Sequence, residues 1–416
     1  MSTTRLFDVL IVGGGPVGAC AGALLARGAQ GGGRPLCVAI LDEARPRAPA
    51  REAPLEPRVL AVSRASERIL ASAGAWARMA LERACAYERM RVWHESVPAR
   101  GEQVLTFDAA EVGEPNLGYI IENRMVQAAL LDAFEACGGV LIPGALTGIA
   151  VREEAIEITA GDATLAARLA IGADGARSRV RELIGLTADM ASYGQTAIVA
   201  NVATALPHER TAYQRFLQFG TLALLPLADG SSSIVWSADE ALAQVLLAAS
   251  PAAFEAELLQ HSDAVLGEPR LVSERLCFPL KRLRAHRYTA RRCALIGDAA
   301  HVVHPLAGQG VNLGLLDAAA LAQEVGRAVR EGEDPGAERV LRRYERWRKS
   351  EIAAMAAAID GFDRLLAHGR SPVAHLAQQA LGWVNRSAPV KRFFIRRALG
   401  IAGELPQAAR PASGAR

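Results

Sequence analysis

The sequence predicts an α/β protein in which a parallel sheet is interleaved along the chain with an antiparallel sheet and followed by a helical C-terminal region. The first observation is that apolar runs lead into glycine-rich loops and helical patterns at 8–26, 169–181 and 295–317. The others are short alternating apolar runs over 190–280 and helical spacing beyond 316. The chain has 416 residues, enough for two or three domains, and its net charge of +3 is too small to predict a nucleic-acid partner.

The N-terminal segment has the loop expected at a bound pyrophosphate. An apolar strand over 9–12 is followed by Gly13, Gly15 and Gly18 in a GxGxxG pattern, and an Ala- and Leu-rich helix begins at this loop. The first glycine makes the tight turn, the second admits the pyrophosphate, and the third lets the helix pack on the strand. Pro16 lies within the same predicted cofactor loop.

A second apolar strand, over 36–41, ends in two acidic residues. Asp42 follows Gly18 by about 24 residues, close to the spacing at which this motif places an acid on the adenosine ribose. Asp42 comes directly after the apolar run, so we prefer it to Glu43 as the ribose ligand.

The segment 295–317 is the most informative part of the chain. Its GD pair places Asp298 at the carboxyl end of a strand, where ligands of open α/β sheets bind. Gly308, Gly310 and Gly314 then allow the backbone to approach a ligand closely, and the following helix begins with free N–H groups. This arrangement suits the polyol and the flavin ring of FAD.

A third segment, 169–181, runs from a short strand into Asp174-Gly175 and then a helix. Either Asp174 or Ser178 could cap that helix, so a purely structural role stays open. Arg181 is most simply a solvated charge on this helix. The alternative is that Arg181 contacts a phosphate of the electron donor that reduces the flavin. Asp317 either pairs or caps within its own helix, or contacts the flavin.

The order GxGxxG, DG, GD is far more specific than any one of these motifs. Together the three resemble the single-component flavoprotein aromatic hydroxylases, the class that includes p-hydroxybenzoate hydroxylase. Within that class the chain is similar to the UbiH/UbiF/VisC family of ubiquinone-biosynthesis hydroxylases. Four stretches carry the resemblance: 58–76, 117–130, 172–181 and 297–318.

The resemblance implies a Rossmann-like FAD-binding domain with particular contacts. Arg58 and Arg124 would lie along the FAD, near its phosphates and ribityl chain. Asp174 would lie near the pyrophosphate, and Asp298 at the ribityl hydroxyls. The flavin ring would be flanked by Pro305 and by the backbone of Gly308, Gln309, Gly310, Val311 and Asn312. We expect Gly308 and Gly310 to need to be glycine, because a Cβ would meet the flavin or demand a disfavoured φ.

The activity implied by the resemblance is hydroxylation of the aromatic ring of a polyprenylated phenol with O2. Reduced FAD would form a flavin hydroperoxide whose distal oxygen is transferred to the ring, and the chemistry would be the cofactor's. NAD(P)H would bind only transiently, since no second nucleotide-binding motif is present. The resemblance also implies possible membership of a ubiquinone-biosynthesis protein complex.

Two alternatives stay open at this point. One is a flavoenzyme of the same architecture acting on another aromatic or isoprenoid substrate, such as a prenyl reductase, an epoxidase or a halogenase. The tryptophans of this chain are isolated, whereas halogenases carry a paired-tryptophan motif. The other alternative is a non-catalytic subunit that binds FAD or a prenyl lipid.

The domains are expected to be discontinuous. We assign 1–75, 117–186 and 271–335 to the FAD-binding domain and 76–116 and 187–270 to the substrate-binding domain. Residues 190–280 are expected to form alternating strands with one helix in the middle. The C-terminal helical region is 336–416.

The remaining patterns predict no metal and a cytoplasmic location. His301 and His304 form an HxxH, but Pro305 follows at once and further ligands are lacking, so we expect these histidines to shape the loop by hydrogen bonds. The six cysteines are scattered without a CxxC pair, as in reduced cytosolic proteins. Asp8 and the adjacent glycines argue against a secretory signal, and no run approaches about 18 apolar residues.

The segment 387–400 has the composition of a basic amphipathic helix. At helical spacing Val390, Phe393, Phe394 and Arg397 share one face. This helix either packs on its own domain or forms a surface for anionic lipid or a partner protein, which would place the protein at the periphery of the membrane.

Overall fold

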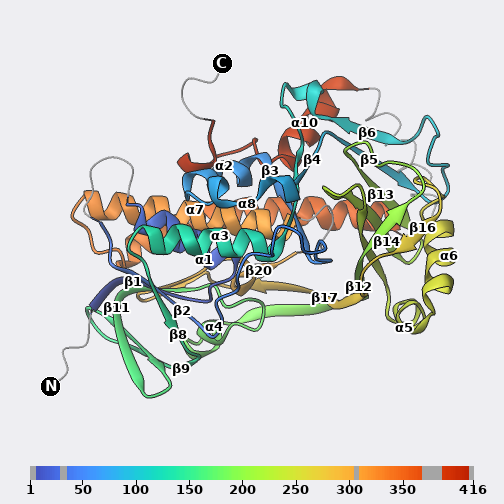
Figure 1. The fold of residues 1–416 in the computed structure, drawn as a ribbon. Coiled ribbons are helices and arrows are strands. Elements are labelled where there is room, and N and C mark those ends of the chain that lie inside the picture. The colour runs from blue at the N-terminus through green and yellow to red at the C-terminus, as the bar shows by residue number, and fades with distance from the viewer. Residues whose placement is uncertain (1–5, 29–34, 304–308, 368–386, 412–416) are drawn as a thin grey trace.

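The computed structural model describes residues 6–28, 35–303, 309–367 and 387–411. Two lobes lie side by side, one built on a parallel sheet under long helices and the other on an antiparallel sheet (Figure 1). Two long strands run from one lobe into the other along the lower edge of the view.

The first sheet is the predicted parallel sheet. Its central strands run in the order β19-β11-β1-β2-β8 with parallel pairing, as expected for nucleotide-binding α/β folds. These strands are β1 (Leu6–Val12), β2 (Val38–Asp42), β8 (Val140–Pro143), β11 (Ala163–Gly172) and β19 (Cys293–Leu295). Antiparallel strands complete the sheet: β9 (Leu146–Val151), β10 (Ile156–Ala160) and β18 (Thr289–Ala290).

Helices cover this sheet along one face (Figure 1). They are α1 (Pro16–Ala26), α3 (Asn123–Ala136) and α7 (Gln309–Arg330), with α8 (Glu338–Ala367) packed on α7. Helix α1 is almost entirely buried because its side chains are small. A Cβ added at Gly22 would lie 2.7 Å from Cδ1 of Ile40, so the glycine allows the helix to approach β2 closely. The short α4 (Arg179–Leu183) follows β11.

The second sheet is antiparallel apart from one strand pair, and it forms the second lobe. Its order is β20-β17-β12-β15-β14-β13-β5-β6, with β16 paired to β12. The long strands that join the lobes are β12 (Ala188–Thr204) and β17 (Leu276–Ala285). The others are β5 (Arg89–His94), β6 (Leu105–Asp108), β13 (Thr211–Leu217), β14 (Gly220–Pro226), β15 (Ser232–Asp239), β16 (Pro269–Leu271) and β20 (His301–Val302).

The prediction of a single helix within 190–280 is wrong. Two helices are present, α5 (Glu240–Ala248) and α6 (Pro251–His261). The chain breaks between them because Ser250 caps α6 with its side chain and Pro251 occupies the first turn of that helix.

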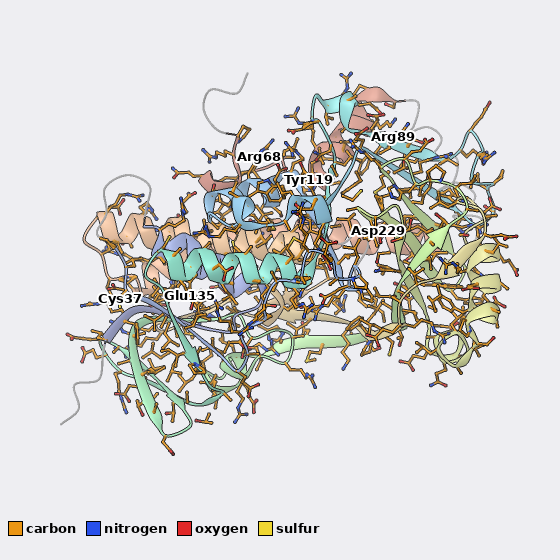
Figure 2. All side chains as sticks on the ribbon, in the orientation of Figure 1. Cys37, Arg68, Arg89, Tyr119, Glu135 and Asp229 are labelled. Atoms are coloured by element: carbon orange, nitrogen blue, oxygen red, sulfur yellow. The ribbon has the colours of Figure 1, made fainter. Side chains whose placement is uncertain are left out.

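A small third sheet connects the lobes. It consists of β3 (Val59–Ser63), β7 (Gly118–Glu122) and β4 (Cys85–Tyr87), and α2 (Arg64–Ser72) follows β3. Tyr119 of β7, labelled in Figure 2, packs edge-on against Trp76 with ring centroids 5.0 Å apart. Strand β4 lies in the segment 76–116, which we assigned to the substrate-binding domain, but it pairs with β7 of the segment 117–186. Strand β17 lies in the segment 271–335, which we assigned to the FAD-binding domain, but it belongs to the second sheet. The exact domain division stays a prediction.

Short 3-10 turns and a last helix complete the described chain. The turns are η1 (Trp76–Arg78), η2 (Leu81–Arg83), η3 (Ala109–Val112), η4 (Gly297–Ala299) and η6 (Gln407–Ala409). Segment 387–400 does form a helix, α10 (Ala388–Ala398), and its buried side chains are not those of the face that contains Val390, Phe393, Phe394 and Arg397. Phe393 is 58% exposed, whereas Ile395 and Leu399 are buried against Leu117. Across the described residues, no helix is long and apolar enough to cross a membrane.

Candidate cofactor and substrate site

The three glycine-containing motifs meet at one edge of the parallel sheet. Val12, Gly172 and Leu295 are register partners at the carboxyl ends of β1, β11 and β19, and Val12 also faces Leu41 of β2. The loops that follow these strands therefore gather at the same edge, as the sequence predicted. This is the edge where open α/β sheets bind ligands.

The GxGxxG loop has the shape that its pattern predicts. Gly13 has φ +103°, and a Cβ on it would lie 2.5 Å from the carbonyl oxygen of Ala173. A Cβ on Gly18 would lie only 2.0 Å from the carbonyl oxygen of Gly13, so the third glycine is needed for helix–strand packing. A Cβ on Gly15 would meet nothing within 4 Å. Gly15 thus faces open space at the N-terminus of α1, whose first helical residue is Pro16.

Asp42 lies at the end of β2, beside this loop. Its carboxylate accepts hydrogen bonds from the N–H groups of Gly14 (2.5 Å) and Ala44 (2.9 Å), whereas Glu43 is exposed. Gln127 of α3 donates to the carbonyl of Gly14 at 2.8 Å. Gln127 was missed by the sequence reasoning, although it lies three residues after Arg124 and so one helical turn further along α3.

Asp298 stands apart from the other acids of the site. Its side chain is exposed, and no residue in the described ranges donates a hydrogen bond to its carboxylate. The surrounding wall nevertheless removes much of its solvent, and this desolvation raises the pKa of Asp298, while the nearby charges of His301 and Arg58 oppose the rise. An open carboxylate in a recess at the end of β19 is suited to accept hydrogen bonds from hydroxyl groups of a ligand.

Asp174 uses its carboxylate to cap α4. It accepts hydrogen bonds from Ser178 Oγ (2.6 Å) and from the N–H groups of Arg179 (2.7 Å) and Val180 (3.0 Å). Its backbone nitrogen nevertheless lies beside the glycine loop, 2.9 Å from the position of a Cβ built on Gly13. The side chain of Asp174 therefore has the capping role that was one of its two alternatives. Its proximity to a bound pyrophosphate stays a prediction.

The simplest expectation for Arg181, a solvated helix charge, is wrong. The side chain is buried and donates to the carbonyl of Ala299 at 2.7 Å and to that of Ala176 at 2.9 Å. Arg181 thus ties the turn after β11 to the turn that carries Asp298. Both ends of its guanidinium group are occupied by backbone carbonyls, which disfavours a contact to the reductant's phosphate.

Asp317 pairs within the protein, which was one of its two open alternatives. Its fully buried carboxylate accepts hydrogen bonds from His301 Nε2 (2.6 Å), Arg348 Nε (2.7 Å) and the N–H of Gly297 (3.0 Å). Burial by itself would raise the pKa of Asp317, but His301 and Arg348 lower it overall. The prediction that His301 shapes its loop by a side-chain hydrogen bond is confirmed.

The loop predicted to flank the flavin lies only partly within the described residues. His304, Pro305 and Gly308 lie outside the described residues, and α7 begins at Gln309. Gly310 lies within this helix without a positive φ, so the expected backbone strain at this position is wrong. A Cβ on Gly310 would meet nothing within 4 Å, and Val311 is half-buried behind it.

Asn312 fixes the first turn of α7 to the adjacent elements. Its side-chain oxygen accepts from the N–H of Ser63 (3.0 Å) and from Ser66 Oγ (2.7 Å), while its nitrogen donates to the carbonyl of Ala61 (2.9 Å). The side chain of Asn312 is therefore committed to contacts within the protein.

The two predicted arginine ligands have different surroundings. Arg124 lies in the first turn of α3 and forms an ion pair with Glu56 at the surface. Arg58 lies with its guanidinium carbon 5.9 Å from the ring centroid of Phe278 on β17, close enough to Asp298 to influence its pKa. Arg58 therefore lies between the predicted cofactor edge and the second sheet.

Arg58 also lines a cavity of about 280 Å³ that the sequence reasoning missed. The cavity lies between the small third sheet and one face of the antiparallel sheet. Its wall is mostly apolar, and alternate residues of each strand point into it. The strand residues of this wall include Ala197, Val199, Ala212, Gln214, Thr221, Ala223, Leu225, Val235 and Ser237. The alternating pattern of the strands predicts that the sheet has two different faces, but it does not show which of them borders a cavity.

Few polar groups enter this cavity. Among the described lining residues Arg58 is the only charged one, and Tyr87, Gln214, Thr221 and Ser237 contribute neutral polar groups. Burial raises the pKa of Tyr87 to about 12. The hydroxyl group of Tyr87 therefore stays protonated at neutral pH and can donate a hydrogen bond.

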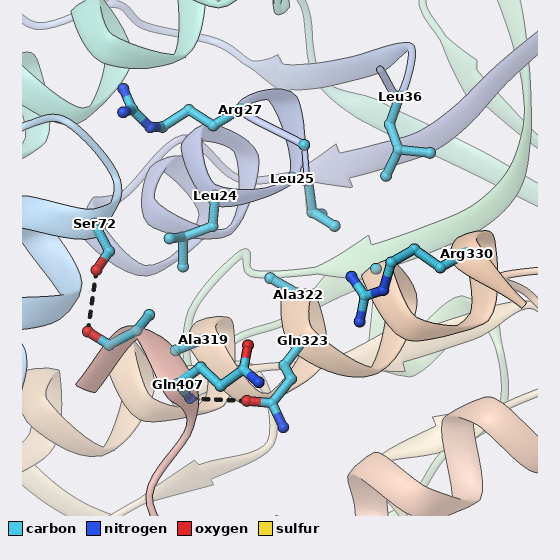
Figure 3. Close-up of a pocket in the computed structure, with 13 residues that line it drawn as sticks. Leu24, Leu25, Arg27, Leu36, Ser72, Ala319, Ala322, Gln323, Arg330 and Gln407 are labelled. Carbon is cyan, nitrogen blue, oxygen red and sulfur yellow. Dashed lines mark hydrogen bonds between the residues drawn. The ribbon is translucent and has the colours of Figure 1, made fainter. Parts of the chain in front are cut away.

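A second hollow, shown in Figure 3, belongs to another part of the molecule. It has a volume of about 140 Å³ and lies between the C-terminal end of α1, α7 and η6, where Gln407 N donates to Gln323 Oε1 at 2.8 Å. The 11 residues of α1 separate it from the glycine loop by roughly 16 Å. It is therefore distinct from the site at the strand ends. No group of three or more His, Cys, Asp or Glu side chains in the described ranges is arranged to hold a metal ion.

The sequence profile described as the FAD binding domain matches residues 6–358. Ubiquinone hydroxylase UbiL of Rhodospirillum rubrum is 36% identical over 402 residues, covering 96% of this chain and 91% of the relative. The 3-demethoxyubiquinol 3-hydroxylase of Escherichia coli is 33% identical over 402 residues, covering 96% and 100%. The chain belongs to the FAD-dependent ubiquinone-biosynthesis hydroxylase family. The resemblance predicted from the four sequence stretches is thus confirmed.

The fold of this hydroxylase is shared with solved flavoprotein structures. The p-nitrophenol 4-monooxygenase PnpA of Pseudomonas putida superimposes with a TM-score of 0.73 at 18% identity, covering 95% of this chain and 98% of the other. An identity this low shows the common fold alone.

The described residues of the hydroxylase fit FAD. Gly15 leaves open space where a pyrophosphate would meet the first turn of α1, and a side chain there would fill it. Asp298 offers an unengaged carboxylate where ribityl hydroxyls would lie, and Asp42 lies beside the same loop. These positions follow one edge of the sheet, as an extended dinucleotide requires.

Proposed function

We propose that this FAD-dependent hydroxylase adds oxygen to the aromatic ring of a polyprenylated phenol in ubiquinone biosynthesis. The observation that carries the proposal is the apolar cavity that reaches the cofactor edge at Arg58, beside Asp298. At about 280 Å³ it is close to the lower limit of small-molecule sites, which is about 300 Å³. An aromatic head group suits this volume, and a long isoprenoid tail would extend beyond it.

The cofactor edge would hold FAD through a small set of residues. Gly13, Gly15 and Gly18 would place the pyrophosphate at the N-terminus of α1, Asp42 would bind the adenosine ribose, and Asp298 the ribityl hydroxyls. Once reduced, bound FAD supplies the activation of O2 and the transfer of one oxygen atom to the ring.

The cavity would position the substrate ring and exclude water. Its apolar strand residues favour the ring and its first isoprene unit over solvent. The protonated phenol of Tyr87 can orient an oxygen of the substrate, and Arg58 can stabilise negative charge on a phenol oxygen next to the cofactor edge. The helix N-terminus at Gln309 and Gly310 would stabilise negative charge on the reduced cofactor.

The overall reaction requires a two-electron donor, for which we propose NAD(P)H bound transiently. One ring C–H, O2, NAD(P)H and a proton then give the ring hydroxyl, water and NAD(P)+. We further propose a cytoplasmic location, peripheral membrane contact through 387–400 and association with other enzymes of the pathway. All six cysteines lie in the described part of the chain and none forms a disulfide, which supports a reducing compartment.

The test combines a purified enzyme with a deletion strain. The FAD-loaded protein is given a short-chain prenylphenol, 18O2 and either NADH or NADPH, and the product is analysed by mass spectrometry. We expect one 18O atom in the ring hydroxyl and oxidation of the nicotinamide. In cells, deletion should deplete the quinone and accumulate a less-hydroxylated prenylphenol. A normal quinone level in a strain without a paralogue contradicts the proposal and favours a different flavoenzyme activity.

A further inference from the structure

The C-terminal helix α10 has two chemically different faces. Lys391, Ile395 and Leu399 point inward, where the aliphatic side chains pack against Leu117 and Lys391 forms an ion pair of 2.6 Å with Glu111. The outward face consists of Pro389, Arg392, Phe393 and Arg396, all of them exposed. Their spacing of three, four and seven residues places them on a single stripe.

The outward stripe combines an exposed aromatic ring with cationic side chains. Phe393 leaves 58% of its surface in solvent and is flanked along the chain and along the helix by Arg392 and Arg396. The stretch 387–403 contains four cationic residues and no acidic residue. An exposed aromatic ring among arginines combines an apolar group that can enter a lipid interface with charges that attract anionic headgroups.

The helix is fixed to the body of the protein. The N–H of Ala65 donates to the carbonyl of Leu399 at 3.2 Å, and Gly400 follows in the left-handed region with φ +66°. Helix α10 lies at the upper end of the second lobe, near β6 (Figure 1). Its outward stripe is therefore held in one orientation relative to the substrate cavity.

The inward face of α10 is connected to that cavity by two side chains. Tyr87 and Met90 pack against the cluster that contains Ile395 and Leu399, and the same two side chains line the cavity. Only one layer of side chains thus separates α10 from the space proposed for the substrate ring.

We propose that the stripe of Pro389, Arg392, Phe393 and Arg396 docks the enzyme on an anionic lipid surface, next to the cavity that receives the substrate. The proposal rests on the proposed function, because only a substrate with an isoprenoid tail needs to be taken from a membrane. Charge complementarity selects anionic lipid as the occupant of this face, and Phe393 provides the apolar contact.

The test uses the full-length, FAD-loaded enzyme with vesicles. Co-sedimentation is measured with phosphatidylcholine vesicles that contain 30–40% phosphatidylglycerol, a composition on the order of strongly anionic biological membranes. The variant carries Arg392→Gln, Phe393→Ser and Arg396→Gln. We expect it to bind at least tenfold more weakly than the wild type, and we expect rising salt to weaken wild-type binding.

A matched control removes the same groups elsewhere. Arg152 and Arg342 have side-chain exposures of 60% and 62%, and Phe219 is 55% exposed. Changing Arg152→Gln, Phe219→Ser and Arg342→Gln should leave vesicle binding within twofold of the wild type. Equal binding by the α10 variant and the wild type overturns the proposal, as does equal binding of the wild type to pure phosphatidylcholine. Failure of the wild type to bind any vesicle overturns it too, and then favours a protein partner for this face.

A second readout separates this proposal from the proposed function. The α10 variant should hydroxylate a soluble short-chain prenylphenol as fast as the wild type, but should turn over a long-chain prenylphenol in anionic vesicles at least fivefold more slowly. If the wild type does not hydroxylate the soluble phenol, the proposed function fails, and the vesicle binding data still decide the docking proposal.

Discussion

His301 and Asp317 are joined by a hydrogen bond of 2.6 Å between Nε2 and Oδ2, buried between the start of β20 and helix α7. Asp317 also accepts from the N–H of Gly297, the residue before Asp298. This contact links the turn that carries the proposed FAD ligand to α7, which begins at the predicted flavin loop. A change at Asp317 should therefore affect both stability and the cofactor.

Asp317→Asn should destabilise the protein by about 3–5 kcal/mol at neutral pH, because it leaves Arg348 and His301 buried without their anion. The lowered pKa of Asp317 means that its contribution is complete above the unfolded value of about 3.9 and is lost as the pH falls through the folded value. Urea unfolding across pH should thus show the gap from the wild type closing only below about pH 4. A gap that is independent of pH contradicts this account. Asp162→Asn, at an exposed turn, is the control.

Asp298→Ala should remove most of the FAD from the purified protein. The loss of a charged acceptor costs about 1.5–3 kcal/mol, or at least a tenfold loss of affinity. FAD per chain and the dissociation constant are measured by absorbance and fluorescence, with Asp162→Ala as the exposed control. Full FAD occupancy in the Asp298→Ala protein would falsify the assignment of the GD motif.

FAD affinity should depend on pH through the same residue. Desolvation raises the pKa of Asp298 in the protein without FAD, so a larger fraction of the carboxyl is protonated under mildly acidic conditions than for an ordinary aspartate. Because the carboxylate is the stronger acceptor, FAD affinity should rise with pH until this group is fully ionised. Fluorescence titrations should show this slope in the wild type and a much weaker one in Asp298→Asn. Parallel slopes in the two proteins contradict the role of Asp298.

Gly310→Val should impair hydroxylation severely while the protein still folds. Gly310 is helical and a Cβ there meets open space, so any damage must come from a clash with bound cofactor or substrate rather than from backbone strain. Gln309→Ala should be milder if the backbone of this turn matters more than the amide side chain. FAD content and hydroxylation rate are measured with the reductant in excess. Normal turnover in Gly310→Val together with an inactive Gln309→Ala would make Gln309 the catalytic candidate.

Ala223→Phe should block the substrate without displacing the cofactor. Ala223 points into the apolar cavity from β14, so a benzyl group there occupies space needed by the substrate ring. We expect at least a tenfold loss of kcat/KM with unchanged FAD content. Val245→Phe, on the exposed surface of α5, is the matched control, since Val245 is 65% exposed. Unchanged kcat/KM in Ala223→Phe would place the substrate elsewhere.

Local sequence patterns were enough to predict the parts of the site that depend on short segments. Gly13, Gly15 and Gly18 occur within one strand–turn–helix unit, and Asp42 and Asp298 each come directly after an apolar strand. A strand that ends in a parallel sheet places the next residue at a known edge, so the meeting of these motifs followed from local pattern alone.

Other features could not be predicted, because they depend on contacts between segments that are far apart in the sequence. Arg181 is buried because the carbonyl of Ala299, 118 residues further along the chain, accepts from it. Asp317 has a partner 31 residues away in Arg348, and α10 turns Ile395 inward because Leu117 lies beneath it. The hollow face of the antiparallel sheet likewise depends on how the small third sheet is placed against it. Periodicity gives the two faces of a strand or helix, but the choice between them is made by whatever packs against that element, and that information is spread over the whole chain.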